Sequence, residues 1–414
     1  VKGFGVLDYV AAWYMKAAQL IANTPTKVAF VSTNSITQGE QVGVLWNLLF
    51  NHYNIKIHFA HRTFKWSNEA RGNAAVHVVI IGFANYDTNN KRIFEYEDIK
   101  SEPHEIKAKN INGYLVDAKD IFIERRSNPI QSFAPNMNYG SEPREGGFLL
   151  LSESEKEDII SKEPQIEKFI KRFVSSNDFI NNNYRYCLWL VDADPSEIKN
   201  STFIKERLEN VRIFRSQSLQ KSANASQYTP ALFTSIRQPK SNYLLIPIVS
   251  SENRKYIPIG YLDPNNIASN ASFTLENATL YHFGIITSLM HMVWIKAICG
   301  RLESRLRYSN TIVYNNFPWP ENPTEKQIKA IEEAAQKVLD TRLEYPNSTL
   351  ADLYDPLTMP SALVKAHNEL DKAVDLAYRP QPFTSETNRM VYLFDLYEKY
   401  TADLFTKEKP KRKK

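Results

Sequence analysis

The order of helix and strand patterns in the first 83 residues restricts the fold of this 414-residue chain more than any other feature. Apolar side chains at helical or strand spacing predict helices at 8–22 and 41–50 and strands at 28–31, 55–59 and 76–83. Asp8 stands where an N-cap is expected. Helix, strand, helix, strand, strand is the order of the second half of a doubly wound α/β sheet with a terminal β-hairpin. Because the first half of such a sheet is missing and Val1 is not a natural start, we expect a piece of a longer protein.

The remainder of the chain is interpreted from similar changes of pattern. Residues 84–145 are rich in loops, and we place the first domain boundary between 110 and 130. Later apolar patterns predict strands at 184–191, 241–249 and 255–262, and helices at 283–298, 361–378 and 385–405. Thr324 and Gln327 form a capping-box pattern before one more helix. The expected domains are 1–115, 116–320 and a helical region at 321–406, followed by a disordered basic tail at 407–414.

Composition and cysteine usage exclude several classes of protein. The net charge of +5 is too mild to imply nucleic acid by itself. Cys187 and Cys299 are far apart and lack metal-ligand spacing, which fits a reducing cytosol and argues against disulfides. No secretory signal is recognisable, and the apolar segment 283–298 is too short and too mixed for a membrane span. We therefore expect a cytoplasmic protein that does not contact a membrane.

The chain has few of the motifs that a nucleotide-dependent enzyme needs. A cofactor turn on a doubly wound sheet is rich in glycine and follows the first strand. Gly3-Phe4-Gly5 has no strand before it, and no P-loop, Asn-Pro-Pro-aromatic tetrapeptide or Pro-Asp dipeptide is present. His58 and His61 lack Cys and carboxylate partners nearby, which favours structural or phosphate-contacting histidines over metal ligands. The residues predict neither a catalytic group nor a metal site.

Residues 301–309 gather the side chains most suited to nucleic acid. They include three arginines, a carboxylate and two hydroxyls, at Arg301, Glu303, Arg305, Arg307, Tyr308 and Ser309. Glutamate accepts from cytosine N4, and arginine forks onto guanine O6 and N7. Glu303 and Arg305 are two residues apart and would share one face of an extended chain, as reading a single G·C pair requires. An intramolecular ion pair or a solvated face is the open alternative.

A second basic segment joins two predicted strands at 61–75. Arg62, Lys65 and Arg71 alternate there with Phe64 and Trp66. Basic and aromatic side chains on an exposed loop suit contact with nucleic acid. An ordinary surface loop whose Trp66 packs on the core is an equally good interpretation of these residues.

Four long blocks resemble the γ-class adenine-specific DNA methyltransferases, in particular the single-chain restriction–modification enzymes of Type IIG and Type IIL. These blocks are VAFVSTNSITQGEQVGVLW at 28–46, IKIHFAHRTFKWSNEARGNAAVHVVIIGF at 55–83, NRKYIPIGYL at 253–262 and HFGIITSLMHMVWIKAICGRLESRLRYSNTIVYNNFPWP at 282–320. The similarity extends over roughly residues 5 to 400. Motifs of this length are far more specific than a single tripeptide.

The resemblance implies a fold, a partner and a cofactor. It implies the C-terminal half of a Rossmann-like methyltransferase sheet, followed by a mixed α/β target-recognition domain and a helical C-terminal region. The implied partner is double-stranded DNA, and the implied reaction of the parent protein is adenine-N6 methylation. S-adenosylmethionine would be bound mainly by the missing upstream part, so this chain is expected to recognise DNA without turnover.

The resemblance also implies roles for single residues. Phe83 would stack against a flipped adenine, with ordinary packing at a strand end as its alternative. Glu303 and Arg305 would read one base pair. Phosphates would be held by Arg301, Arg307, Tyr308 and Ser309.

Two other classes of function stay open at this point. One is a DNA-specificity module without enzymatic role, like a Type I specificity subunit. The other is a structural or RNA-binding protein whose basic cluster is merely solvated.

Overall fold

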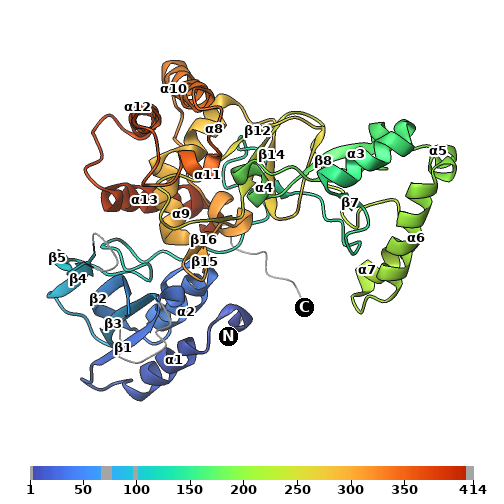
Figure 1. The fold of residues 1–414 in the computed structure, drawn as a ribbon. Coiled ribbons are helices and arrows are strands. Elements are labelled where there is room, and N and C mark those ends of the chain that lie inside the picture. Colours follow the sequence, from blue (N-terminus) through green and yellow to red (C-terminus); the bar gives the residue numbers. More distant parts are fainter. Residues whose placement is uncertain (1–2, 67–76, 97–100, 407–414) are drawn as a thin grey trace. The chain divides into compact units, whose positions relative to one another are not determined.

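The computed structural model describes residues 3–66, 77–96 and 101–406, whose helices and strands are drawn in Figure 1. The chain divides into two compact units. The first unit consists of Val1–Phe133, Leu289–Pro323 and Asp375–Lys414. The second consists of Ala134–Ser288 and Thr324–Val374. Each unit is thus assembled from separate segments, whereas the predicted domains follow the chain in order. The predicted tail at 407–414 lies outside the described residues.

The first unit is built on a five-stranded sheet with two helices from the same part of the chain. Its strands are β1 (Val28–Thr33), β2 (Lys56–Lys65), β3 (His77–Ala84), β4 (Lys91–Glu95) and β5 (His104–Ala108), in the order β1-β3-β2-β4-β5. Its helices are α1 (Val10–Leu20) and α2 (Gly39–Asn51). β3 runs antiparallel to both β1 and β2, so the predicted terminal hairpin is confirmed. The partial methyltransferase-type sheet expected from the sequence is present.

Aromatic packing joins this sheet to its helices. The Tyr14 ring of α1 stacks on Phe83 of β3 at 5.5 Å and meets Trp46 of α2 edge-on at 5.8 Å. All three side chains are at most 1% exposed. Full burial of rings of this size supplies a large part of a core's stabilisation. The prediction of Asp8 as N-cap is wrong, because α1 begins after Tyr9 without a side-chain cap.

The first unit is completed by later segments of the chain. These are α9 (Leu289–Ile298), the hairpin strands β15 (Gly300–Leu302) and β16 (Arg305–Arg307), the π-helix η5 (Asn310–Tyr314) and α13 (Glu386–Thr406). Trp294 of α9 lies 6.1 Å from Phe394 and 5.9 Å from Tyr397 of α13. The last helix of the chain therefore supports the helix that precedes the hairpin.

The apolar segment 283–298 forms two helices instead of the single one predicted. α8 (Leu280–Thr287) ends where the Ser288 backbone turns extended, at ψ 163°. The Ser288 hydroxyl donates to the Ile285 carbonyl at 2.7 Å, which closes the last turn of α8. Serine competes with helical hydrogen bonds in this way, and apolar periodicity alone does not reveal the break.

The second unit combines two four-stranded sheets with short helices. One sheet has the order β12-β10-β14-β6, and the other has the order β13-β8-β9-β7. The strands of these sheets are β6 (Met137–Tyr139), β7 (Leu150–Leu151), β8 (Ile170–Val174), β9 (Tyr186–Leu188), β10 (Tyr243–Pro247), β12 (Gly260–Leu262), β13 (Asn266–Ala268) and β14 (Ser272–Glu276). The short strand β11 (Val249–Ser250) belongs to neither of them. Besides α8, the helices of this unit are α3 (Glu153–Lys162), α4 (Ser176–Asn181), α5 (Pro195–Asn200), α6 (Thr202–Ser216), α7 (Lys221–Ala225), α10 (Glu325–Leu343), α11 (Leu350–Leu353) and most of α12 (Ser361–Tyr378).

Predictions for this unit are confirmed in part. The Thr324 side chain accepts from the Gln327 amide in a complete capping box, as expected. The predicted strand at 255–262 pairs only over Gly260–Leu262. Pro258 has no amide to donate to a ladder, which is one reason why the earlier residues stay outside the sheet.

Two buried arginines organise the loops of the second unit. All five N–H groups of the fully buried Arg215 donate to carbonyl oxygens, at 2.8–3.1 Å from Pro143, Arg144, Ser226, Thr229 and Leu232. Arg342 donates to the Ile259 carbonyl at 2.6 Å and to the Tyr354 hydroxyl at 2.8 Å. A buried guanidinium is tolerated when its donors are satisfied, so both arginines serve the fold.

Candidate nucleic-acid interface

The polar cluster at 301–309 lies on and directly after a tight β-hairpin. Gly300 pairs with Arg307, Arg301 with Leu306, and Leu302 with Arg305, which leaves Glu303 and Ser304 as a two-residue turn. Glu303 adopts φ 58°, in the left-handed region that residues with a Cβ seldom occupy. Strain of this kind persists where surrounding contacts fix the backbone, and it is common at functional sites.

The outward face of β16 carries two arginines. Arg305 and Arg307 are exposed, whereas Leu306 between them is 2% exposed, as strand alternation requires. Arg305 donates to the Glu303 carboxylate at 2.9 Å, with 46% and 78% of these side chains exposed. The ion pair that the sequence left open therefore exists in this structure. An exposed pair contributes only about 0–1 kcal/mol, so both groups can exchange it for contacts with a ligand.

Arg301, Tyr308 and Ser309, for which phosphate contacts were predicted, make hydrogen bonds within the protein. Arg301 donates to the Cys299 sulfur at 2.8 Å and to the Lys296 carbonyl at 3.0 Å. The Tyr308 hydroxyl is buried against His291, and burial raises the Tyr308 pKa well above its usual range. The Ser309 hydroxyl accepts from the Ile312 amide at the start of η5. Their positions favour support of the hairpin over contact with DNA.

The end of β2 bears a second group of predicted residues. Arg62 is paired with Glu95, Lys65 is half-buried, and the Trp66 side chain is 40% exposed. Phe64 stacks on Tyr96 at 5.0 Å. Residue 71 and the rest of the segment 67–76 lie outside the described residues.

The two histidines of β2 have partners within the fold. His58 Nε2 lies 2.8 Å from the Tyr86 carbonyl, and its residue is 8% exposed. His61 stacks on Phe94 at 4.2 Å, and its Nδ1 lies 2.9 Å from the Tyr96 hydroxyl. Burial lowers the His61 pKa, which favours the neutral ring. These contacts support the structural interpretation that the sequence favoured.

Phe83 occupies the core of the first unit. Its ring is 1% exposed and packs on Tyr14, and its backbone pairs with Val28 and Ile57 on either side. A ring must present a free face to stack on a base. The packing alternative is therefore the one that this position supports, and Trp66 is the exposed aromatic residue near the end of the same sheet.

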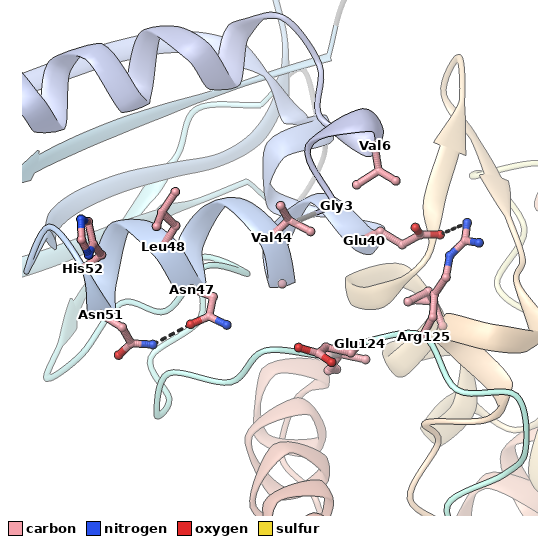
Figure 2. Close-up of a pocket in the computed structure, with 13 residues that line it drawn as sticks. Gly3, Val6, Glu40, Val44, Asn47, Leu48, Asn51, His52, Glu124 and Arg125 are labelled. Carbon is pink, nitrogen blue, oxygen red and sulfur yellow. Dashed lines mark hydrogen bonds and ion pairs between the residues drawn. The ribbon is translucent and has the colours of Figure 1, made fainter. Parts of the chain in front are cut away.

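A cleft of about 780 Å³ is lined by α2 together with residues 123–125, and nothing in the sequence pattern indicated it (Figure 2). Glu40 and Arg125 form a 2.6 Å ion pair there, and Asn51 donates to Asn47 at 2.7 Å. Glu124 adds a second carboxylate to the lining. The size suits a small molecule, but two carboxylates make the cleft a poor site for a phosphate backbone.

Comparison with known proteins identifies the family. Three family models match consecutive segments: the MmeI DNA-methyltransferase domain at 1–95, the MmeI target recognition domain at 117–321 and the MmeI C-terminal domain at 323–405. A solved structure of the Type IIL restriction–modification enzyme MmeI in complex with DNA is 51% identical, with a TM-score of 0.88 over 97% of this chain. The chain belongs to the MmeI-like family of single-chain restriction–modification methyltransferases.

A curated relative, DNA methyltransferase A of Bacillus subtilis (strain 168), is 42% identical to this chain over 402 residues. The match covers 97% of this chain but 45% of that protein, and the match to the MmeI structure covers 53% of its chain. The chain thus spans about half the length of these relatives. The match of a methyltransferase domain to residues 1–95 disfavours the alternative of a non-enzymatic DNA-specificity module like a Type I specificity subunit.

None of the helices in the described part of the MmeI-like chain is long and apolar enough to cross a membrane.

Sequence analysis missed His291, whose imidazole is hydrogen-bonded to the Tyr308 hydroxyl. A polar residue within the apolar pattern of α9 was the available signal, because buried polar groups need a partner.

Proposed function

We propose that this chain provides sequence-specific recognition of double-stranded DNA for a methyltransferase of a restriction–modification system. The observation that carries the proposal is the β15–β16 hairpin, which presents Glu303, Arg305 and Arg307 on a well-packed base. The MmeI structure was determined in complex with DNA, and the Bacillus protein is named as a DNA methyltransferase, which supports this function.

The hairpin offers both kinds of contact that recognition of DNA requires. Arg305 would fork onto guanine O6 and N7, while Glu303 would accept from cytosine N4 of the same pair. Breaking their exposed ion pair costs about 0–1 kcal/mol, whereas a good bidentate base contact discriminates by about 1–3 kcal/mol. Base reading therefore wins over the internal pair once DNA is bound. Arg307 would hold a phosphate and fix the register.

Adenine-N6 methylation with S-adenosylmethionine is proposed for the longer protein. A cofactor turn needs closely spaced glycines between a strand and a helix. No glycine lies between β1 and α2; Gly39 is the first residue of α2, and a Cβ there would meet the Gly300 backbone at 3.4 Å. These residues do not form a cofactor turn, so no catalytic step is assigned to them. We expect this chain to bind DNA without turnover.

Stacking on an extruded base is proposed for Trp66 in preference to Phe83. Extrusion of a base costs unstacking energy, and an aromatic face recovers part of it. Trp66 offers such a face at 40% exposure, while Phe83 at 1% exposure would first have to leave the core. The proposal also implies a cytoplasmic protein, because a bacterium such as the source of the Bacillus relative keeps its DNA in the cytoplasm.

Selection of bound duplexes from a randomised pool tests the proposal directly. The full chain would be mixed with the pool at moderate salt, and the retained duplexes would be sequenced. Enrichment of one short site containing adenine is expected. Affinity should also fall on the order of a thousandfold between roughly 50 and 200 mM salt if about six to ten phosphates are contacted. Equal retention of all sequences would contradict the proposal.

A further inference from the structure

The hairpin that carries Glu303 and Arg305 is tied to α9 through both of its strands. From β15, the Arg301 guanidinium donates a hydrogen bond to the Lys296 carbonyl, near the end of α9, at 3.0 Å. On the β16 side, the Tyr308 hydroxyl lies 2.8 Å from His291 Nε2. Leu306, which pairs with Arg301 across the hairpin, is 2% exposed. Each strand of the hairpin is therefore held separately.

The contact between Tyr308 and His291 is deeply enclosed. The two residues are 3% and 0% exposed. The His291 ring also meets Phe317 edge-on at 4.4 Å, so the imidazole is held from a second side. A hydrogen bond between buried groups is costly to break without a substitute, because each polar atom would lose its partner far from water.

The hydrogen bond between Tyr308 and His291 lies close to the exposed arginines along the chain and can influence their positions. Arg307 is adjacent to Tyr308, and Arg305 is three residues away, or about 10 Å along an extended chain. A small change of the strand direction at Tyr308 is thereby enlarged at the Arg305 guanidinium. Recognition groups must be held within about 0.5 Å of their productive positions. Base contacts on the hairpin therefore depend on how firmly Tyr308 is anchored.

We propose that Tyr308 and His291 are positioning residues for base selectivity, and that their hydrogen bond sets the direction in which the hairpin presents Glu303 and Arg305 to DNA. This inference rests on the proposed function. It assigns to Tyr308 an indirect role in recognition instead of a phosphate contact. Arg301 serves the other strand in the same way.

The test uses the full chain with Tyr308→Phe, which removes the hydroxyl and keeps the ring. The measured quantity is the ratio of Kd values for the selected duplex and for the duplex changed at the pair that Glu303 and Arg305 read. We expect this ratio to fall by about three- to tenfold, as the loss of one neutral hydrogen bond predicts. Affinity for unrelated duplexes and its salt dependence should stay unchanged.

Two further variants separate positioning from stability. His291→Leu should lose the same selectivity, with no further loss when it is combined with Tyr308→Phe. His291→Gln can restore a polar atom near Nε2 and should retain most of the ratio. Tyr114→Phe is the matched control, because that buried tyrosine packs on Phe394 of α13 and not on the hairpin. It should leave the ratio unchanged.

The outcomes of these experiments test the positioning role separately from the proposed recognition of DNA. Unchanged selectivity in Tyr308→Phe, with or without a lower melting temperature, would overturn the positioning role alone. A wild-type chain that prefers no sequence would overturn the proposed function and the inference together. A uniform loss of affinity for every duplex would mean that Tyr308 acts on phosphate binding, which also contradicts the inference.

Discussion

Glu303 and Arg305 face solvent across a hairpin turn and hold each other at 2.9 Å. Exchanging their charges, with Glu303→Lys and Arg305→Asp together, keeps an ion pair and inverts the pattern of donors and acceptors offered to DNA. We expect a changed base preference at one position of the site and a melting temperature close to that of the wild type, because surface substitutions seldom cost more than about 0.5 kcal/mol. Sequencing of selected duplexes measures the first effect. An identical preference in the double variant would refute base reading by this pair.

Arg307 differs from Arg305 because no hydrogen bond or ion pair joins its guanidinium to another described side chain. Arg307→Ala should weaken binding to all duplexes about equally and reduce the slope of log affinity against log salt by about one. Titrations at several salt concentrations measure both. Lys329→Ala removes the same charge from the exposed side of α10 and serves as the control. A sequence-dependent loss in Arg307→Ala would show that it reads bases.

At the scale of elements, the hairpin depends on the protonation of a helix residue. Burial lowers the pKa of His291 to about 3, while an unfolded imidazole titrates near 6.5. Between these values the unfolded chain binds a proton that the folded chain does not. The free energy of unfolding should therefore fall as pH decreases below about 6.5, by up to about 1.4 kcal/mol per pH unit for this group.

Urea unfolding at a series of pH values between about 7 and 5 measures this dependence. Burial also lowers the pKa of His367 in the second unit, so the wild-type slope should exceed that of one group. His291→Gln should reduce the slope of the free energy of unfolding against pH by the contribution of one titrating group, which is up to about 1.4 kcal/mol per pH unit. The same substitution at the exposed His52 is the control. Equal slopes for both variants would exclude a neutral buried imidazole at position 291.

At the scale of the whole molecule, helix α13 near the end of the chain packs into the same unit as residues 1–133. The Tyr397 hydroxyl donates to the Asn316 side chain at 3.3 Å, and the Tyr400 hydroxyl donates to the Trp319 carbonyl at 3.0 Å. Phe394 is fully buried beside Trp294. The segment after the hairpin and the end of the chain thus share one core.

Phe394→Ala should therefore destabilise the first unit by about 3–5 kcal/mol, the usual cost of deleting a buried aromatic ring. Hydrogen exchange is the suitable measurement, since it reports each unit separately. Amides of α9 and of β3 should lose protection, while those of β10 in the second unit should keep it. Equal loss in β10 would show that the two units unfold as one.

Three strands of the sheet in the first unit, β1, β2 and β3, were predictable because their patterns are encoded locally, whereas β4 and β5 lie in the segment 84–145 that was wrongly predicted as rich in loops. Val28, Val31 and the run at 76–83 carry strand patterns within a few residues, and β1 and β3 follow them closely. The break at Ser288 was not predictable, since apolar periodicity continues through it. Of the candidate site, the exposed Arg305 and Arg307 were found from residue type and spacing. His291 was missed because its partner is 17 residues away.

Local pattern therefore determined which segments become helices and strands and where the charged cluster lies, because periodicity and turn chemistry act over a few neighbouring residues. Tertiary contacts decided which members of that cluster face outward. Arg301 and Tyr308 point inward because α9 supplies a carbonyl and an imidazole as partners. Arg305 and Arg307 stay exposed, and among the described side chains Arg305 pairs only with the exposed Glu303 carboxylate. Phe83 went into the core because Tyr14 of α1 covers its ring. Contacts between residues that are distant in the sequence produce no periodic pattern from which they could be predicted.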